Sequence, residues 1–398
     1  MAKKTVKDIN VSGKSVLLRV DYNVPFSPHT SNISDDSRIR ASIPTIDYLL
    51  KHNCKIIICS HMGRPKGKFV DTLKMKPVAD RLSEILGITV SQAISCTGHN
   101  VKAAAQKLQA GQVMILENLR FHYGEEENNA QFASELASLA QIYVNDAFGS
   151  AHRAHASTEG VTRFIPAVAG LLMAKELEIL GQALEAPKRP LIAILGGAKI
   201  SDKIGVLEHL AGKVDKLIIG GGMAATFLKA KGHNIGNSLV DKDKVKFAAD
   251  FIKTTSKEGP YLFLPSDAII ATDPAAGKGH KIVDISKVEK GYSIFDIGPR
   301  TTKLYTQELL TAKTVIWNGP MGIFEFQRFS QGTAGIAHTL SNLTKATTII
   351  GGGSTAEAVI NLGLGNKMTH VSTGGGASLE FLEGKMLPGV TALMNYTE

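Results

Sequence analysis

The sequence, 398 residues long, contains few cysteines and no long apolar run. Its three cysteines, Cys54, Cys59 and Cys96, form no C-x-x-C pair, so we expect buried, reduced thiols rather than a disulfide framework. No purely apolar run approaches the ~18 residues needed to span a bilayer. The first ten residues, MAKKTVKDIN, have no apolar stretch of the kind found in secretory signals. These absences predict a cytoplasmic protein that does not act at a membrane.

Positive charge is present but is not concentrated. The formal net charge is +9, yet no run of five or six basic residues occurs, and the lysines are spread along the chain. Proteins that bind the nucleic-acid backbone carry a basic stripe or patch, and none is visible here. We therefore expect a small anionic ligand, with nucleic-acid binding as an alternative that only the net charge suggests.

The sequence also lacks two motifs that would define a catalytic site. Neither G-x-x-x-x-G-K-[ST] nor G-x-S-x-G occurs, and Gly13-Lys14-Ser15 matches only the end of the first and precedes an apolar run, so a P-loop nucleotidase is excluded. The turn that begins at Gly220 matches the dinucleotide-binding pattern weakly, and no acidic residue is well placed about 20 positions later to hold a ribose. A nicotinamide-dependent dehydrogenase is therefore a second, less favoured alternative.

What the chain does contain is a repeated alternation of short apolar runs with helical patterns. Many of its 39 glycines lie where the apolar runs end. This rhythm predicts an α/β fold in two arrays of parallel strands, with helices between the strands. The strands that we expect are Ser15–Val20, Lys55–Ser60, Val113–Leu116 and Gln141–Val144 in the first array, and Leu191–Leu195, Lys216–Ile219, Tyr261–Leu264, Thr314–Trp317, Thr347–Ile350 and His370–Ser372 in the second.

Between the two arrays lies a long stretch of good helix formers, Ala167–Leu184. A polar connector with two prolines, EAPKRP at 185–190, follows it. A change of composition of this kind is typical of a domain junction. We therefore expect a helix over 167–184 that bridges two lobes.

In the first array, charged and polar side chains follow the strands. The carboxyl ends of parallel strands meet at one edge of a sheet, where ligands bind in open α/β folds. Arg38, near the start of a predicted helix, is disfavoured by the helix dipole, which points to an anionic partner; a solvated surface arginine is the more common alternative. Several arginines at one edge would bind a multiply charged anion through bidentate contacts. The candidate residues are Asp21, Asn23, Arg38, His61, Arg64, Arg120 and Arg153.

A metal site is less favoured in this region. His152 and His155 could form a pair of ligands, but no further cysteine or histidine stands at ligand spacing. We therefore interpret the two histidines as buried or surface residues rather than as a metal centre.

The second array carries glycine at its strand ends instead of arginine. It begins with LIAILGGAKISDKIGV, a strand, a glycine turn and a helix that we expect Ser201 to cap. Lys199 and Lys203 lie four residues apart beside this turn and suggest a polyphosphate ligand. Five such turns would offer a cradle of backbone N–H groups and helix N-termini. They lie at residues 196–197, 220–222, 319–322, 351–353 and 374–376.

Eight segments together resemble the phosphoglycerate kinase family. They are VDYNVP, SHMGRPKG, ENLRF, NDAFGSAHRAHAS, LGGAKISDKI, IGGGMA, VIWNGPMGIFE and STGGGASLEFLEGKMLPGV, and they span nearly the whole chain in the family's order. The resemblance implies two Rossmann-like lobes, an N-terminal one over 1–166 and a C-terminal one over 187–382. It also implies a hinge helix over 167–186, and a tail, 383–398, that packs back on the N-terminal lobe.

The resemblance further implies an activity. Enzymes of this family transfer a phosphoryl group reversibly between 1,3-bisphosphoglycerate and ADP, giving 3-phosphoglycerate and ATP, with Mg²⁺ and after closure of the two lobes. The acceptor and donor groups are already ionised, so no general base is needed, and alignment with charge stabilisation suffices. The resemblance implies a monomer whose partners are these small molecules.

The family's roles carry over to residues of this chain as implications of the resemblance. The implied substrate-binding residues are Asp21, Tyr22, Asn23, Arg38, His61, Met62, Gly63, Arg64, Arg120 and Arg153. The implied nucleotide-binding residues are Lys199, Lys203, Gly220, Gly221, Asn318, Glu325, Gly351, Gly352, Gly353 and Ser354. Arg38, Lys199 and Gly375 would act on the phosphoryl group in transfer.

One position departs from the family pattern. The last nucleotide turn commonly reads G-G-G-D, where the aspartate helps to hold the metal, and here it reads Gly351-Gly352-Gly353-Ser354. A serine hydroxyl is a neutral oxygen ligand, so the expected Mg²⁺ contact at Ser354 is weaker than a carboxylate would give.

Overall fold

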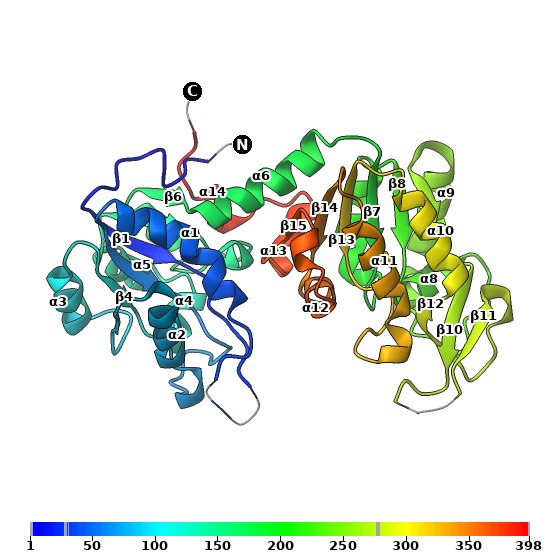
Figure 1. Cartoon of the computed structure of the whole chain (residues 1–398), viewed down its shortest axis with the longest axis horizontal. Coiled ribbons are helices and arrows are strands. Elements are labelled where there is room, and N and C mark those ends of the chain that lie inside the picture. Colours follow the sequence, from blue (N-terminus) through cyan, green and yellow to red (C-terminus); the bar gives the residue numbers. More distant parts are fainter. Residues whose placement is uncertain (1–2, 28–29, 31, 276–278, 397–398) are drawn as a thin grey trace. The chain divides into compact units, whose positions relative to one another are not determined.

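The computed structural model describes residues 3–27, 30, 32–275 and 279–396. It divides into two compact units, Met1–Glu178 with Met386–Glu398 and Ile179–Lys385, and each has its own parallel sheet covered by helices (Figure 1). The predicted α/β fold with two parallel sheets is confirmed. The division falls inside one helix, α6 (Leu171–Glu185). Residues 1–2 and 397–398, the outer ends of the expected lobe and tail, lie outside the described residues.

Unit 1 is built on a six-stranded sheet of order β3-β4-β2-β1-β5-β6, in which every neighbouring pair is parallel. Because all its strands run the same way, their carboxyl ends meet at one edge. The strands are β1 (Ser15–Arg19), β2 (Lys55–Cys59), β3 (Val90–Gln92), β4 (Val113–Ile115), β5 (Ile142–Asn145) and β6 (Ala167–Ala169).

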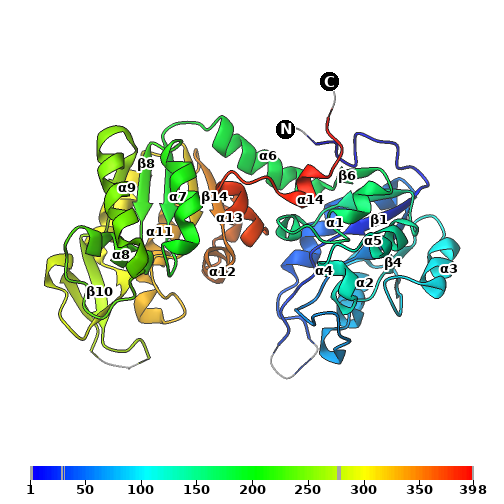
Figure 2. The same ribbon diagram turned by 180° about the vertical axis from the view of Figure 1, so that it is seen from behind.

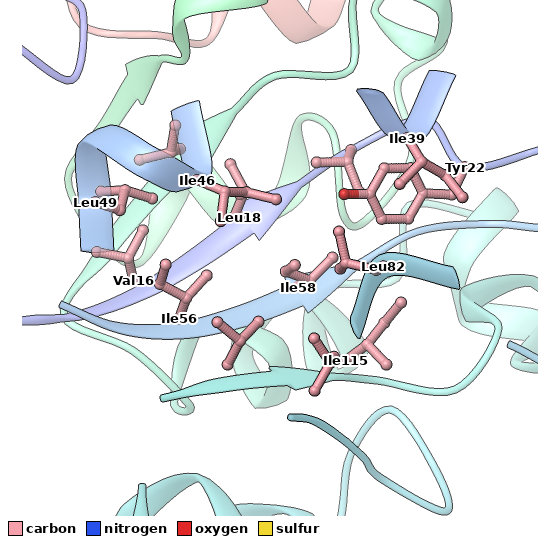
Figure 3. Close-up of a cluster of buried hydrophobic side chains, with 14 of the residues drawn as sticks. Val16, Leu18, Tyr22, Ile39, Ile46, Leu49, Ile56, Ile58, Leu82 and Ile115 are labelled. Atoms are coloured by element: carbon pink, nitrogen blue, oxygen red, sulfur yellow. The ribbon is translucent and has the colours of Figure 1, made fainter. Parts of the chain in front are cut away.

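Helices pack on this sheet through a continuous apolar core (Figure 3). Leu18 of β1 faces Ile46 of the first helix, and Ile58 of β2 lies beside Leu82 of the second. Leu17, which points to the opposite face, is also 0% exposed, as expected for a parallel sheet covered on both sides. The helices of unit 1 are α1 (Ser37–Lys51), α2 (Lys76–Leu86), α3 (His99–Lys107), α4 (Tyr123–Glu126), α5 (Ala130–Ala137) and α14 (Pro388–Thr391).

Unit 2 repeats the design with a sheet of order β15-β14-β13-β7-β8-β9, again parallel throughout. Its strands are β7 (Leu191–Leu195), β8 (Lys216–Ile219), β9 (Tyr261–Phe263), β13 (Thr314–Asn318), β14 (Thr347–Gly351) and β15 (His370–Val371). Its helices are α7 (Ile204–Ala211), α8 (Met223–Ala230), α9 (Val245–Glu258), α10 (Pro299–Leu309), α11 (Gln331–Ser341), α12 (Gly353–Asn361) and α13 (Gly376–Leu382). Helix α11 lies in front of the sheet in Figure 1 and α7 in front of it in Figure 2, so both faces are covered.

A second, antiparallel sheet in unit 2 was not expected from the sequence. It contains β10 (Asp267–Ala271) between β11 (Lys281–Asp284) and β12 (Ser293–Ile297). Only β10 is buried along its length; β11 begins with two exposed residues. Strands β11 and β12 give a weak pattern because exposed and half-buried positions do not need a continuous apolar run.

Two local predictions are wrong. Residues Ala167–Ala169, expected to be helical, form β6 and pair with β5, and α6 begins at Leu171. The helix starts there because groups from elsewhere in the chain accept its first N–H bonds: Thr45 Oγ1 from Leu171 (2.9 Å) and Asp146 Oδ1 from Leu172 (2.9 Å). Sequence propensity could not reveal these distant partners.

The second error concerns the cap of the helix after β7. Ser201 lies in a short 3-10 turn, Ser201–Lys203, and the helix α7 begins only at Ile204 with Lys203 in the capping position.

Every strand that we expected is present, with ends within one residue of prediction, whereas the short β3 was missed.

The end of the chain belongs to unit 1. Asn145 Nδ2 donates to the carbonyl of Gly389 (3.0 Å), and the N–H of Met394 donates to the carbonyl of Ala167 (3.0 Å). Lys3 Nζ donates to the carbonyl of Leu393 (2.8 Å). The last described residues are therefore fixed by both the beginning and the middle of the chain.

Cys54, Cys59 and Cys96 are buried, free thiols, as predicted. Burial raises the pKa of Cys54 to about 11 and that of Cys59 to about 12, so both stay protonated. Within the described residues, no helix combines the length and the apolar character that crossing a bilayer requires.

Candidate functional site

At the carboxyl end of β1, Asp21 holds the side chain of Arg38. Arg38 Nη1 lies 2.8 Å from Asp21 Oδ1, and its side chain, on the first turn of α1, is 36% exposed. The pKa of Asp21 is lowered overall: burial raises it, and the charges of Arg38 and Arg19 and the N–H of Asn23 lower it, so the group is a carboxylate. An arginine that is anchored on one side and exposed on the other is ready to bind a second anion.

The turn after β2 is clamped from both sides. Asn23 Oδ1 accepts the N–H of Gly63 (2.8 Å), and Arg120 Nη1 donates to the carbonyl of Gly63 (2.7 Å). Gly63 has φ +61°, a conformation that favours glycine. The three residues, predicted from three separate strand ends, are therefore joined by direct hydrogen bonds.

His61 is buried and neutral. Its Nδ1 lies 3.2 Å from Arg19 Nη2, and because a guanidinium can only donate, Nδ1 accepts and the ring proton is on Nε2. Burial lowers the pKa of His61 well below its ordinary value; Asp21 opposes this shift and Arg19 adds to it. The ring therefore offers one N–H donor and carries no charge.

Arg120 and Arg153 are close to each other, and Arg64 is more exposed. Arg120 is 4% exposed, its Nε lies 3.2 Å from Glu126 Oε1, and burial and the charge of Arg153 lower its pKa. Arg153 is half-buried, and its Nε lies 3.2 Å from a ring nitrogen of His152. In the described chain, neither Arg64 nor Arg153 forms a salt bridge, so both guanidinium groups keep donors for a ligand.

Two of the expected substrate residues are part of the core. Tyr22 is 0% exposed, its hydroxyl bonds to Ser42 Oγ (2.6 Å) and its N–H to Ser60 Oγ (2.9 Å). Met62 is 2% exposed, and Asn118 accepts its N–H (3.0 Å) and donates to its carbonyl (2.8 Å). Neither residue presents a free side-chain group; both fix the backbone on which Asp21 and His61 stand.

Sequence reasoning missed the buried residues that support this site. Arg19 is 1% exposed; its Nε donates to Ser157 Oγ (2.8 Å), and Ser157 donates in turn to Glu125 Oε1 (2.6 Å). An arginine inside the apolar run SVLLRV was the available signal, since a charged residue in a buried strand needs partners. Asn118, in the segment ENLRF, carried no such signal.

In unit 2, three glycine turns pack main chain against main chain. The N–H groups of Gly196, Gly197 and Gly221 donate to the carbonyls of Asn318 (3.0 Å), Pro320 (3.1 Å) and Met321 (2.9 Å). A Cβ at Gly196 would lie 2.2 Å from the carbonyl oxygen of Pro320. The prediction that these turns offer N–H groups to a ligand is wrong for Gly196, Gly197 and Gly221, because the protein uses those three groups to hold the turns together.

Gly220 and Gly319 have the same structural role. The N–H of Gly220 donates to the carbonyl of Leu195 (2.9 Å), and a Cβ there would lie 2.4 Å from Met321 Sδ. The N–H of Gly319 donates to Thr355 Oγ1 (2.7 Å). These glycines shape the surface at the strand ends by allowing close approach.

The turn after β14 differs, because it opens a helix. Gly351 ends β14, Gly352 caps α12 with φ +85°, and Gly353 and Ser354 occupy its first exposed turn. N–H groups in a first turn have no acceptor within the helix and suit an anion. A Cβ at Gly352 would lie 3.3 Å from Asn318 Nδ2, a buried amide nitrogen without a hydrogen-bond partner. Main-chain N–H groups of α12 and the side-chain amide of Asn318 therefore lie close together at this turn.

The side chain of Lys203 reaches Asn318, beside the turn before α12. Its Nζ bonds to Asn318 Oδ1, and burial lowers the pKa of Lys203 to about 8. Lys199 and Glu325 are exposed. Gly375, with φ +50°, precedes α13, and a Cβ there would meet no atom within 4 Å. The structure thus joins Lys203, Asn318 and the α12 turn.

The residues do not form a metal cage by themselves. Among the described residues, no group of three or more histidines, cysteines, aspartates or glutamates is placed to hold an ion. Ser354 offers one neutral hydroxyl beside N–H donors that suit phosphate oxygens. This arrangement fits Mg²⁺ only as the companion of a polyphosphate that supplies most of its oxygen ligands.

Comparisons with known proteins agree along nearly the whole chain. A family model described as phosphoglycerate kinase matches residues 6–385. A phosphoglycerate kinase of Pelotomaculum thermopropionicum is 53% identical over 395 residues, which cover 99% of this chain and 100% of the relative. One of Moorella thermoacetica is 51% identical over 393 residues, covering 99% of each.

Solved structures give the same result. The structure of phosphoglycerate kinase from Coxiella burnetii matches with a TM-score of 0.88 and 40% identity, covering 98% of both chains. That from Pyrococcus horikoshii matches with a TM-score of 0.86 and 32% identity over the same shares. Family model, relatives and fold coincide, and the chain is an enzyme of the phosphoglycerate kinase family.

Proposed function

We propose that this enzyme transfers a phosphoryl group reversibly between 1,3-bisphosphoglycerate and ADP, giving 3-phosphoglycerate and ATP, as a step of glycolysis. The observation that carries the proposal is the linked set at the edge of the unit 1 sheet, in which Asp21 anchors Arg38 and Gly63 joins Asn23 to Arg120. Such a set suits a small molecule with several negative charges. We expect the enzyme to act as a cytoplasmic monomer, without membrane or nucleic-acid partners.

Unit 1 binds the phosphoglycerate in this proposal. The exposed side of Arg38 and the free donors of Arg64 and Arg153 contact the anionic groups of the ligand. His61 donates a hydrogen bond from its Nε2–H without adding charge. Arg120, whose Nη1 is already bonded to Gly63, contributes mainly through its charge and by fixing the turn.

Unit 2 binds the nucleotide. Lys203 and Asn318, joined to each other, and the N–H groups of Gly353 and Ser354 receive the phosphates. Gly351 and Gly352 keep side chains away from the start of α12, Gly220 and Gly221 shape the neighbouring turn, and Glu325 is available for the ribose hydroxyls. Mg²⁺ would neutralise charge on the phosphates, and the hydroxyl of Ser354 would be its ligand from the protein.

The chemical step needs no proton transfer by the protein, because the attacking phosphate oxygen and the departing carboxylate are both ionised. The rate then depends on alignment and on stabilising the charge that is shared in the transition state. We propose that Arg38 from unit 1 and Lys199 from unit 2 supply this charge, with the main chain at Gly375. Bending along α6 (Leu171–Glu185), the helical part of the expected hinge, brings the two ligands together and excludes water.

A coupled assay of ATP-dependent 3-phosphoglycerate phosphorylation tests the proposal. Arg38→Ala and Lys199→Ala should each lower turnover by more than about a hundredfold, as expected for the loss of a main charge stabiliser. Arg40→Ala is the matched control, because Arg40 lies on the same helix but is paired with Asp36 (2.9 Å) at the surface. Near-normal turnover in both test variants would contradict the roles.

A further inference from the structure

The feature that carries a further inference is the free edge of the unit 2 sheet. Strand β9 is the last strand of the sheet and, among the residues that the structure describes, pairs only with β8, in parallel. The N–H of Tyr261 donates to the carbonyl of Asp215 (3.1 Å), and because alternate residues of a parallel strand face the same neighbour, Phe263 also faces β8. Leu262, between them, directs its N–H and carbonyl to the side without a strand.

A cavity of about 730 Å³ runs along this edge. Eight consecutive residues, Gly259–Ser266, line the cavity. Residues of α8 and α9 form one side of it, and the other side is formed by the start of the 3-10 turn at Ile285 and the start of α10. Helices α8 and α9 lie beside β8 in Figure 2. A wall made of consecutive edge-strand residues means that the cavity occupies the position of an additional strand. Its volume lies within the usual range of ligand pockets, about 300–1,000 Å³.

The cavity lining is positively charged. It contains Lys231, Lys257, His233 and Arg300, and Asp284 is the acid among the residues that line it. Asp284 is already paired with Arg300 (2.6 Å). Lys231 and Lys257 are exposed, and within the described chain neither forms a salt bridge, so the lining keeps an excess of two positive charges.

The edge is also limited in length. Pro260 and Pro265 stand just outside the strand, and a proline has no N–H to offer to a further strand. Prolines at such positions prevent extended edge-to-edge association between sheets. They leave one short stretch, centred on Leu262, that can still accept and donate main-chain hydrogen bonds.

We propose that this cavity binds a short extended peptide with acidic side chains, contributed by a partner protein, which adds to the sheet as a strand beside β9. The main chain of the peptide bonds to Leu262, and its acidic groups contact Lys231 and Lys257. None of the lining residues belongs to the sets assigned above to phosphoglycerate or nucleotide. The site is therefore separate from the phosphoryl-transfer chemistry and does not rest on it.

The test uses the peptide Glu-Val-Glu-Val-Glu-amide, labelled with fluorescein on its N-terminal amine, and the full-length protein at low ionic strength, with fluorescence anisotropy as the readout. A short edge and two charges predict a dissociation constant on the order of 100 µM, typical of a weak contact. The same peptide with an N-methyl group on its central residue, and the Lys-Val-Lys-Val-Lys analogue, should each bind at least tenfold more weakly.

Variants locate the binding on the protein. Lys257→Glu reverses one of the two charges, and Leu262→Pro removes the outward N–H while leaving the bonds of Tyr261 and Phe263 to β8. Both should weaken peptide binding at least tenfold and leave phosphoryl transfer unchanged. Lys229→Glu is the control for charge, because Lys229 is exposed on α8 but does not line the cavity.

Several outcomes would overturn the proposal. Absence of binding at 1 mM peptide would do so, as would equal affinity for the N-methylated peptide, which would exclude strand addition even if Leu262→Pro does not fold. Displacement of the peptide by free glutamate at equal concentration would show a simple anion site instead. Binding that is insensitive to Lys257→Glu would place the peptide elsewhere.

Discussion

The two sheet edges in this chain are built in different ways. At the edge of unit 1, side chains contact one another: Asp21 holds Arg38, and Asn23 and Arg120 hold the turn at Gly63. At the edge of unit 2, main chain contacts main chain, and the N–H of Gly196 donates to the next turn. One edge is defined by the functional groups that it carries, and the other by the absence of side chains.

This difference suits the two proposed ligands. A small molecule with charge at both ends needs fixed cationic forks, which pairs and networks of side chains provide. A nucleotide has a long flat body, and the glycine turn before α12 lets its phosphates approach the first N–H groups of that helix. The comparison predicts that the two edges will respond differently to the same kind of substitution.

The largest effect is expected from adding a methyl group to the main-chain edge. Gly196→Ala would place a Cβ 2.2 Å from the carbonyl oxygen of Pro320, so the turns must separate. We expect a loss of about 3 kcal/mol or more in the free energy of unfolding. Chemical denaturation measures it, with Gly212→Ala as the control, since a Cβ there meets no atom within 4 Å. Similar stability of the two variants would show that the turns are not closely packed.

The next effect compares two asparagines. Asn118 is buried and bonds to Met62 twice, to the carbonyl of Leu73 (3.0 Å) and to the N–H of Arg120 (3.1 Å), so Asn118→Ala should cost about 2 kcal/mol of stability. Asn318 bonds to Lys203, and its Nδ2 has no partner, so Asn318→Ala should cost less than about 1 kcal/mol. Equal losses of stability in the two variants, measured by thermal unfolding, would show that the two edges do not differ in this way.

A pH titration sharpens the role of Lys203. Burial lowers the pKa of this amine to about 8, so its charge is present below that pH and is lost as the pH rises through it. The dissociation constant for ADP should therefore rise by up to about tenfold between pH 7 and pH 9. In Lys203→Arg the charge persists, and the rise should disappear. A rise of equal size in both proteins would mean that another group titrates.

The smallest effect concerns the metal. Ser354 is exposed at the start of α12 and offers a neutral oxygen. Ser354→Asp adds a carboxylate and should tighten binding of Mg-ADP about threefold at low magnesium, because Mg²⁺ prefers charged oxygen ligands. Ser341→Asp, at the end of α11, serves as a control for added charge. An unchanged magnesium dependence would place residue 354 away from the metal.

Much of the fold was predictable because it depends on local pattern. The buried parallel strands are short apolar runs ended by glycine or polar residues, and LIAIL at Leu191–Leu195 was predicted without error. The beginning of α6 was not predictable, since its cap comes from Thr45 and Asp146, more than a hundred and about 26 positions away. The strand β11, KIVD, has only two consecutive apolar residues, too short a run to indicate a strand.

The site was predictable to the extent that its residues follow strands. Asp21, Asn23 and Arg120 were identified in this way, and hydrogen bonds join them to their neighbours at one edge. The sequence could not reveal that Arg19 sets the tautomer of His61, because that contact joins two strands. Nor could the sequence reveal that N–H groups of the glycine turns donate hydrogen bonds to carbonyls of neighbouring turns.

The central claim is that each unit carries one ligand, and separate binding titrations test it most directly. Calorimetric titration of 3-phosphoglycerate and of ADP into Arg38→Ala and Lys203→Met gives four dissociation constants to compare with the unmodified protein. The account predicts that Arg38→Ala weakens 3-phosphoglycerate binding at least tenfold and leaves ADP binding unchanged, and that Lys203→Met does the reverse. If either variant weakens both ligands equally, or weakens only the other ligand, the division of the site between the two units is wrong.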